Sequence, residues 1–510
     1  MAAETSKLKS SLLAGAGVAA VVALLAHSPV VERLELRTRD LRNEWTMRPA
    51  VDGDPFGHPA VALLMVTQES IDWLQQESKR PWPWPREVFG YLFRACAIGG
   101  AEAILFDFFT HIDPDPLGTE KEWVAEMKKA PPAWFAVPFS ERARPTADAR
   151  EDLSALLDRW AIRVDNDGSV ELEEPYASVN LPVPEVAPAI AGVCDVHTPR
   201  DVDGLIRRCR MLTRFRGRHY PSFALAALMA REKVREARIR AGRLEVGRVS
   251  FPVERDGSVR IRYAQPFGFM AASPVISGVW DLEEKGGTTQ FDPARLKGRV
   301  VILGTDAPAL FDIRPTPGRE MAGAEIHATV IRNILAGELL RPVPAGVGLL
   351  VVAVLAVGTA LAVRHASALA GAAVALGAAA GYAGLSVALF SAGRIVDLVA
   401  PLAAVGLSYG AASSLNFLFE GRQRLRIKRQ FQHYMSPQVV EKILRNPDAL
   451  SLAGERKLLT IFFMDFAGFT AMSEKLEPTE LVKLINEYHH EAAEEIFRTD
   501  GTLDKYIGDA

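Results

Sequence analysis

Two aspartates near the C-terminal end of the chain have neighbouring residues that are typical of a metal site. Asp465 follows the apolar run 458–464, which predicts a buried strand, and the glycine-containing turn 466–470 leads from it into a helix. Asp509 follows Gly508 in a pair that predicts a tight hairpin turn. A carboxylate at the end of a strand can bind Mg²⁺, and the backbone N–H groups at the start of the next helix can receive phosphate oxygens.

A helix and a second strand must bring these two carboxylates together. Residues 479–498 predict an amphipathic helix, Asp500-Gly501 predicts a turn, and 502–507 predict a strand that returns Asp509 toward the first strand. The apolar positions that share one side of this helix are Leu481, Leu484, Ile485, Tyr488, Ala492 and Ile496. Alone, Asp465 would be a turn-capping residue. Paired with Asp509 it predicts a two-cation site, in which one ion lowers the pKa of a ribose 3′-hydroxyl and the other holds a triphosphate.

This part of the chain resembles the class III adenylate/guanylate cyclase catalytic domain, which has an α+β, ferredoxin-like fold. The segments that match are Phe463-Met464-Asp465-Phe466-Ala467-Gly468-Phe469-Thr470, Asp504-Lys505-Tyr506-Ile507-Gly508-Asp509, Phe431 with Tyr434-Met435-Ser436-Pro437, and Gly454-Glu455-Arg456. The resemblance implies that Asp465 and Asp509 are catalytic metal ligands, supported by the carbonyl of Phe466. The implied cofactors are Mg²⁺ or Mn²⁺, with two ions per site.

The same resemblance implies ATP as the substrate. Backbone groups of Gly468, Phe469 and Thr470 would meet the phosphates, and Lys505 stands where the family places its base-selecting residue. A lysine there is typical of adenylate cyclases, whereas guanylate cyclases usually carry an acidic residue; a solvated strand lysine is the alternative. Because family members build the active site between two domains, a domain that carries both the aspartates and the lysine implies a homodimer.

The chain differs from the family in its extent. It stops at Ala510, after about the first third of the family's domain, so the second base-selecting residue and the Asn and Arg that steady the transition state would lie downstream. We therefore expect the sequence to be a fragment, inactive alone, of an adenylate cyclase. The alternatives are a guanylate cyclase and a non-catalytic sensor or interaction protein that carries a cyclase remnant.

Four apolar blocks, 12–31, 345–363, 368–390 and 395–419, predict transmembrane helices. Each is near the ~20 residues that a helix needs to cross a bilayer core. A cleaved signal peptide is the alternative for the first block, and a buried three-helix core is the alternative for the other three. The charged residues 32–45 after the first block are expected to continue the same helix.

The charges beside these blocks predict the orientation of the chain. Residues 422–429 are strongly basic, so the positive-inside rule places the end of the last span in the cytoplasm. Four spans then place 32–344 outside and both termini inside, as expected for a multi-pass protein of the inner cell membrane. A cytoplasmic helical linker is expected at 420–455, with 425–434 continuing the last span and Ser436 capping a further helix, before the cyclase-like segment 456–510.

Composition limits the remaining possibilities. The 510 residues carry a net charge of −3, which gives no indication of a nucleic-acid partner. The three cysteines, Cys96, Cys194 and Cys209, lack a C-x-x-C partner and predict three buried thiols better than a disulfide or a zinc site.

The long region between the first and second blocks predicts an α/β domain with a largely parallel sheet. The apolar runs 61–66, 103–109 and 300–304 predict strands, and they alternate with predicted helices around 88–98 and 325–335.

This region resembles the CHASE2 family of extracytoplasmic sensor domains. The matching segments are Trp82-Pro83-Trp84-Pro85-Arg86, which is expected to be an irregular loop, Gly99-Gly100-Ala101, Phe106-Asp107, Asp203-Gly204, Arg207-Arg208, Val301-Ile302-Leu303-Gly304, Asp312, Thr316-Pro317 and Gly323-Ala324-Glu325-Ile326-His327-Ala328. Thr67-Gln68 departs from the family, which usually shows an acidic residue there. An unnamed extracytoplasmic ligand is implied. Asp107 stands at a strand end, where α/β domains bind ligands, or caps a turn. Asp312 and His327 could line a pocket, with a structural hydrogen bond as the alternative for each.

Overall fold

The computed structural model is a mixed α/β protein with four helices long and apolar enough to span a membrane. It describes residues 2–47, 54, 56, 58–109, 118–142, 153–285, 291–310, 312–364, 366–431, 458–499 and 501–510. The chain divides into two compact units. One comprises Val18–Ala356 and Leu376–Val405, and the other comprises Met1–Gly17, Val357–Ala375 and Gly406–Ala510.

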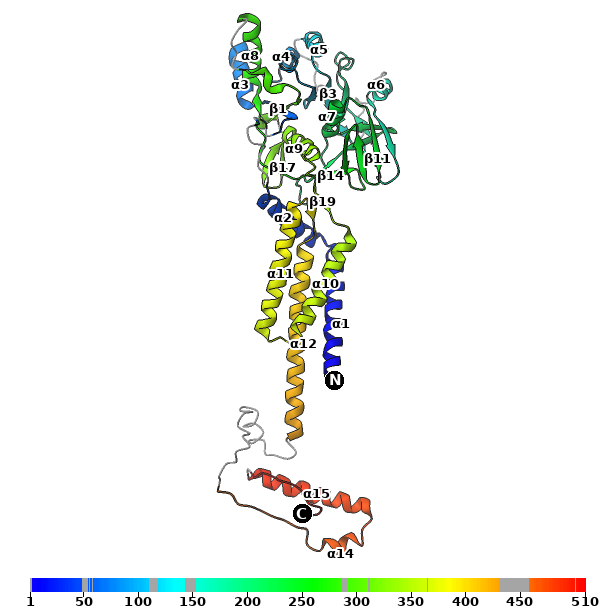
Figure 1. Ribbon diagram of the computed structural model, residues 1–510, viewed down its shortest axis with the longest axis vertical. Coiled ribbons are helices and arrows are strands. Elements are labelled where there is room, and N and C mark those ends of the chain that lie inside the picture. Colours follow the sequence, from blue (N-terminus) through cyan, green and yellow to red (C-terminus); the bar gives the residue numbers. More distant parts are fainter. Residues whose placement is uncertain are drawn as a thin grey trace. The chain divides into compact units, whose positions relative to one another are not determined.

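A six-stranded parallel sheet forms the core of the α/β domain in the first unit. Its strands in spatial order are β15 (Met270–Ala271), β1 (Val61–Val66), β16 (Val300–Thr305), β2 (Ala103–Phe106), β3 (Ala133–Val137) and β7 (Gly192–Asp195). Figure 1 labels two of these strands, β1 and β3. Every neighbouring pair is parallel. The predicted α/β class and parallel sheet are therefore confirmed.

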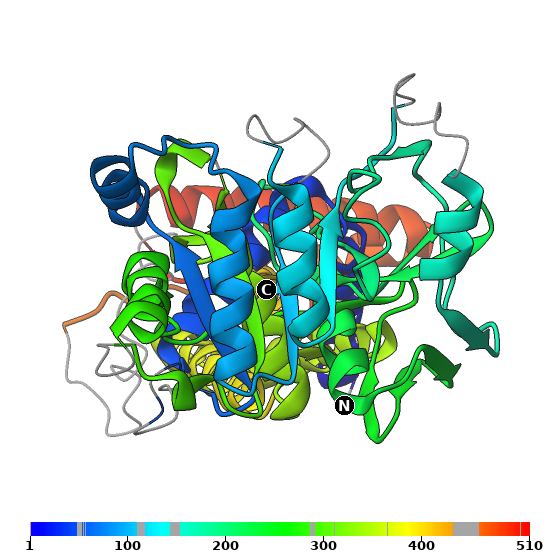
Figure 2. The same ribbon diagram turned by 90° about the horizontal axis from the view of Figure 1, so that it is seen from above.

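Helices cover both faces of this sheet, which explains why its strands read as unbroken apolar runs. On β1, Ala62 and Leu64 pack on one face and Val61 and Leu63 pack on the other. The first face carries α3 (Gln68–Ser78), α4 (Arg86–Ile98), α5 (Glu120–Lys129) and α8 (Ala272–Lys285), and the second carries α7 (Phe223–Glu232) and α9 (Gly323–Leu335). Figure 2 shows α4 (blue) and α5 (cyan) side by side across the strands.

Smaller elements extend the domain beyond β7. A four-stranded sheet has the order β13-β12-β11-β5, and three short antiparallel pairs surround it. These elements are β4 (Phe139–Ser140), β5 (Arg163–Asn166), β6 (Ser178–Val179), β8 (Arg208–Arg210), β9 (Leu212–Phe215), β10 (Arg218–Pro221), β11 (Glu236–Arg240), β12 (Arg243–Val246), β13 (Val249–Pro252), β14 (Ser258–Arg260) and α6 (Leu153–Trp160). Two short 3-10 helices lie elsewhere: η1 (Pro293–Leu296) packs on α4, and η2 (Pro308–Leu310) follows β16. A further hairpin, β17 (Ile313–Thr316) with β18 (Arg319–Ala322), leads into α9. All three cysteines are free and buried, as predicted.

The four candidate membrane spans are Leu8–Leu25 in α1 (Ala2–Leu25), α10 (Ala345–Val363), α11 (Ala368–Ser391) and Val399–Phe419 in α12 (Val399–Phe431). The predicted bounds 345–363 and 368–390 agree closely. Within the first unit, small residues bring the helices together: Val22 packs with Val352, Ala356 and Ala404.

The expected continuous helix from the first span into 32–45 is wrong. Helix α1 ends at Leu25, not at residue 31, and α2 (Pro29–Trp45) begins after a break. Proline disfavours a helical residue before it, and Ser28 accordingly is extended, with φ −73° and ψ 146°. Its hydroxyl accepts a hydrogen bond from the N–H of Val31, so Ser28 caps a new helix.

The fourth span starts at Val399 rather than at residue 395. Residues Arg394–Ile395 form β20, which pairs in parallel with β19 (Arg341–Pro342), so the chain is extended there. Helix α12 then runs without interruption to Phe431, which confirms the predicted helical connection as far as that residue. Residues 432–434 and the predicted cap at Ser436 lie outside the described residues.

The C-terminal segment contains the predicted helix but not the two predicted strands. Helix α15 (Pro478–Arg498) confirms the prediction, and α14 (Phe469–Ser473) follows the turn after Asp465. Residues 458–464 and 502–507 have no strand structure, and Phe463 is 89% exposed. A strand forms only beside a hydrogen-bonded partner, and none of the described residues pairs with either segment.

We predict that Phe106→Ala lowers the free energy of unfolding of the α/β domain by about 3–5 kcal/mol. The Phe106 ring is fully buried and lies 4.6 Å from the ring of Phe135 and 5.4 Å from that of Trp123, between ring centroids. Tryptophan fluorescence of the purified chain during chemical unfolding measures the change. Val202→Ala is the control, because Val202 is exposed and its loss should cost less than ~0.5 kcal/mol. Equal stability of the two variants would contradict this packing.

Candidate functional site

A cavity of about 560 Å³ lies at the carboxyl ends of the parallel strands. Asp107 follows β2, Pro138 follows β3, Asp195 ends β7 and Thr305 ends β16, and all four residues line the cavity. Open α/β sheets bind ligands at this edge, where polar groups at the strand ends converge. The volume suits a small molecule.

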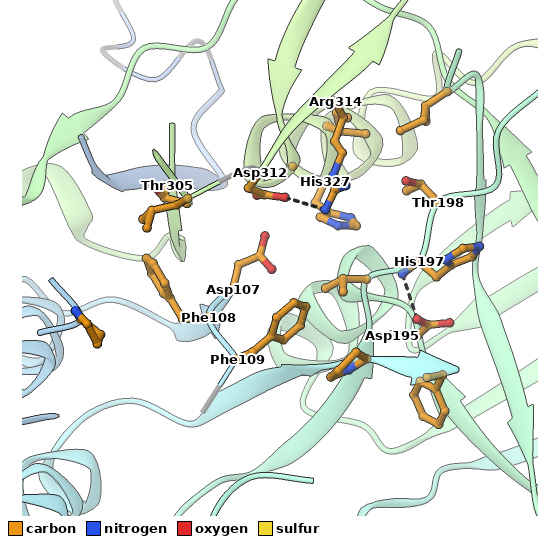
Figure 3. A pocket seen from close by; sticks show the side chains of 18 of the residues that line it. Asp107, Phe108, Phe109, Asp195, His197, Thr198, Thr305, Asp312, Arg314 and His327 are labelled. Atoms are coloured by element: carbon orange, nitrogen blue, oxygen red, sulfur yellow. Dashed lines mark hydrogen bonds and ion pairs between the residues drawn. The ribbon is translucent and has the colours of Figure 1, made fainter. Parts of the chain in front are cut away.

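Two carboxyl groups, those of Asp107 and Asp312, share one side of this cavity (Figure 3). Burial raises the pKa of Asp107 well above its usual value, and the negative charge of Asp312 raises it further. Burial also raises the pKa of Asp312, although Arg314 opposes this with an ion pair in which Nη2 lies 3.2 Å from Oδ1. The positive charge of Arg314 therefore only partly opposes the rise in pKa of the two carboxyl groups.

A third carboxyl group, that of Asp195, is hydrogen-bonded to other residues of the protein. Its oxygens accept hydrogen bonds from the backbone N–H of His197, at 2.9 Å, and from the hydroxyl of Thr213. Burial raises its pKa, and these two donors oppose the rise. Asp195 thus fixes the turn after β7, a role that was not predicted from the sequence.

Two buried nitrogen atoms among the lining residues have no hydrogen-bond partner in the described structure. His327 is 3% exposed and its Nδ1 is unpartnered, and Trp84 is 1% exposed and its Nε1 is unpartnered. Burial, with a smaller effect of Arg314, lowers the pKa of His327 to about 4, so its ring is neutral. The structural hydrogen bond considered for His327 is not formed at Nδ1, whereas Asp312 does have its structural partner.

Aromatic rings form another wall of the cavity. The loop before α4, predicted to be irregular from its prolines, places Trp82 5.5 Å from Trp84 and 6.1 Å from Phe108, between ring centroids. Trp84 in turn lies 5.9 Å from Phe89. The cavity therefore combines an acidic side with an apolar, aromatic one.

The residues that resemble a cyclase site lie in the second unit. Asp465 is exposed, and its Oδ1 accepts a hydrogen bond from the backbone N–H of Phe466. Gly468 has a positive φ of 73° and begins α14, where Phe469 is the first residue and Thr470 the second. The turn into a helix is confirmed.

The second motif ends in the predicted tight turn. Ile507 and Ala510 exchange two backbone hydrogen bonds around Gly508 and Asp509, and Gly508 has a φ of 66°. Lys505 is exposed, with Nζ 3.9 Å from a carboxylate oxygen of the adjacent Asp504. No hydrogen bond or ion pair of the described residues joins Asp509 to Asp465, so their shared role stays a prediction.

Neighbouring residues of α15 contact both the segment after Asp465 and the segment before Asp509. The ring of Phe466 lies 4.6 Å from that of Tyr488, and the ring of Tyr506 lies 4.4 Å from that of His489, between centroids. His489 Nε2 also lies 3.2 Å from the carbonyl oxygen of Gly508. The sequence analysis placed Tyr488 on the apolar face but missed His489, which is buried although its residue type gave no such indication.

A buried network joins α2 to the start of α12 and to the α/β domain. Glu35 accepts hydrogen bonds at 2.9 Å from the backbone N–H groups of Leu398 and Val399, and thereby caps α12. Arg42 pairs with Glu35 at 2.8 Å and donates to the carbonyl of Val396 at 2.7 Å.

The domain itself is tied to α2 by a fork of two hydrogen bonds. Arg207 donates from Nε and Nη2 to the two carboxylate oxygens of Asp40, at 2.8 and 2.6 Å, and also pairs with Asp203. Arg262 donates to the carbonyl of Ser391, at the end of α11. Helix α2 therefore contacts both the domain and the beginning of α12.

Comparison with known proteins identifies the domain. A model of the CHASE2 domain family matches residues 16–362. The chain belongs to the CHASE2-domain family. The match includes the cavity, α2, the second part of the first span and nearly all of the second span, and it ends before the cyclase-like segment.

An adenylate cyclase of Anabaena cylindrica is 36% identical to this chain over 84 residues. The aligned part spans 16% of this chain and 16% of that relative. No solved structure matches the chain.

We predict that Asp107→Asn stabilises the ligand-free CHASE2 domain at neutral pH. A raised pKa means that ionised Asp107 costs folding energy, so this cost is absent at acid pH and grows as the pH rises through that pKa. The melting temperature should rise at pH 7, by about 2–4 °C for each kcal/mol gained, and should match the wild type near pH 4. Thermal melts of the full chain at both pH values test this, with exposed Glu185→Gln as the control. A destabilised Asp107→Asn variant at pH 7 would contradict it.

We predict that Arg42→Met destabilises the CHASE2 domain by about 3–5 kcal/mol, because it leaves the Glu35 carboxylate buried without its partner. Adding Glu35→Gln should recover part of the lost stability. Thermal and chemical unfolding of the full chain measure both changes. Arg33→Met, on the exposed side of α2, serves as the control and should have little effect. An unchanged midpoint for Arg42→Met would refute the role of this pair.

Proposed function

We propose that this chain is the sensor and the first part of the catalytic domain of a membrane adenylate cyclase that converts ATP to 3′,5′-cyclic AMP and pyrophosphate. The observation that carries the proposal is the arrangement of the two aspartate turns. The turn after Asp465 and the turn at Asp509 both pack on α15, through its consecutive residues Tyr488 and His489. The partial similarity to a protein named adenylate cyclase supports the same assignment.

The proposed metal site uses Asp465, Asp509 and the carbonyl of Phe466. All three are oxygen donors of the kind that Mg²⁺ and Mn²⁺ prefer, and both aspartates lie in turns that expose backbone and carboxylate oxygens. When bound, two such cations would neutralise the triphosphate and lower the pKa of the ribose 3′-hydroxyl. Asp465 and Asp509 would bind and orient these groups.

The substrate groups follow from the same motif. Backbone N–H groups of Gly468, Phe469 and Thr470, at the start of α14, would bind phosphate oxygens. Lys505 would select adenine. It is exposed, as a residue that serves the site of a second protomer must be, which supports a homodimer with two equivalent sites.

The membrane orientation is part of the proposal. The basic residues 422–429 lie in the part of α12 beyond the last span, and the positive-inside rule places them in the cytoplasm. The CHASE2 domain would then lie outside the cell membrane and both termini inside. Helix α12 would connect the capped end beside α2 to the cytoplasmic segment as one continuous helix.

Assaying the complete protein with ATP and Mg²⁺ or Mn²⁺ tests the function. We predict that Asp465→Ala lowers cyclic AMP formation by at least about 100-fold, equivalent to ~2.7 kcal/mol of lost transition-state stabilisation. Glu491→Ala, on the exposed side of α15, is the control and should retain activity.

Comparing ATP with GTP tests the base preference, since Lys505→Glu should reduce the preference for ATP. An absence of cyclic AMP from the unmutated complete protein, or an Asp465→Ala variant as active as wild type, would refute the proposal. Equal turnover of GTP would favour a guanylate cyclase.

A further inference from the structure

The cavity of the CHASE2 domain contains groups that the protein itself leaves without partners. The guanidinium of Arg314 is ion-paired with Asp312, and its charge also acts on the carboxyl group of Asp107. Two buried nitrogens, His327 Nδ1 and Trp84 Nε1, have no hydrogen-bond partner among the described residues. Buried polar groups are normally satisfied, so their presence together in one cavity indicates a place built for an occupant.

The charges decide what kind of occupant fits. Figure 3 shows the side chains of Asp107 and Asp312 on the same side of the cavity, with His327 beside them. An anion there would meet two carboxyl groups, whereas a cation would relieve their mutual repulsion. The other basic residues of the lining are Arg86, Arg200 and His197, of which Arg200 and His197 are exposed and therefore lie toward the solvent.

The side chains that line the cavity favour an organic cation over a metal ion. In the part of the chain that the structure describes, no group of three or more His, Cys, Asp or Glu side chains is arranged to hold a metal ion. The cavity is also lined by Trp82, Trp84, Phe89 and Phe108, whose rings contact one another and present apolar surface. Such rings also attract an ammonium group placed over their faces.

We propose that this cavity binds a small organic ammonium compound. Its charged nitrogen pairs with Asp107 and Asp312, and its apolar body packs against Trp82 and Phe108. A hydrogen-bonding group on the same molecule reaches His327 Nδ1 or Trp84 Nε1. The volume of about 560 Å³ accommodates a molecule of the size of an aromatic amine or an amino acid.

Isothermal calorimetry with the purified full chain tests this without any nucleotide, so its result is independent of the cyclase proposal. The probes are phenethylamine, its uncharged analogue 2-phenylethanol and its acidic analogue phenylacetate, each at up to about 10 mM. Phenethylamine should bind, and the two analogues should bind at least about tenfold more weakly.

Two variants locate the binding. Asp107→Asn, which is expected to fold, should abolish the preference for the amine over 2-phenylethanol, and Glu185→Gln should keep it. Trp82→Leu should weaken the binding of phenethylamine but keep the preference for the amine over 2-phenylethanol. Equal binding of amine and alcohol, an unchanged preference in Asp107→Asn, or no binding of phenethylamine would overturn the proposal.

Discussion

The buried ion pair between Glu35 and Arg42 is the constraint on which the arrangement of the first unit depends. Each partner is nearly inaccessible, and each also bonds to the backbone at the start of α12. A buried pair is not a large source of stability, but neither partner can leave it without exposing the other to an apolar environment. The position of α2 therefore fixes the beginning of α12, and Asp40 on the same helix is held by Arg207 of the CHASE2 domain.

Hydrogen bonds connect residues of the domain with α2 and with the end of α11, and they connect α2 with the start of α12. A change in the CHASE2 domain that moves Arg207 or Arg262 must either move α2 and the end of α11 or break their hydrogen bonds. Helix α12 is continuous from Val399, where Glu35 caps it, to Phe431. The cavity lies at the carboxyl ends of the sheet because both faces are covered by helices, which leaves the strand ends as the place for polar chemistry.

Much of the fold could be predicted from the sequence. The runs that became β1 and β16 are apolar on both faces, and helices such as α4 and α9 follow from their periodicity and their place between strands. The break at Ser28-Pro29 has a local signal, a capping serine before proline, but the prediction rested on the helix-forming residues 32–45 and did not use that signal. The strands expected at 458–464 and 502–507 failed for another reason: apolar composition gives a segment the ability to pair, not a partner.

Some features of the candidate sites could be predicted from the local sequence, and others could not. The position of Asp107 at a strand end and the tight turn at Asp509 follow from local patterns, and both are as predicted. The clustering of Asp107 with Asp312 and His327, and the fork between Arg207 and Asp40, 167 positions apart, depend on tertiary packing that one sequence does not reveal. His489 was missed because its partners, Tyr506 and Gly508, become neighbours only when the chain turns back along α15.

Cyclic AMP formed from ATP by the complete protein in sealed vesicles measures directly whether the CHASE2 domain acts as a sensor for the proposed cyclase. The amine is supplied only to the side that carries the CHASE2 domain. The rate should change severalfold with the amine, and both the Asp107→Asn and the Glu35→Gln/Arg42→Met variants should lose this response while keeping a basal rate. A rate that is the same with and without the amine in the unmutated protein would contradict the proposal that the CHASE2 domain is the sensor of an adenylate cyclase.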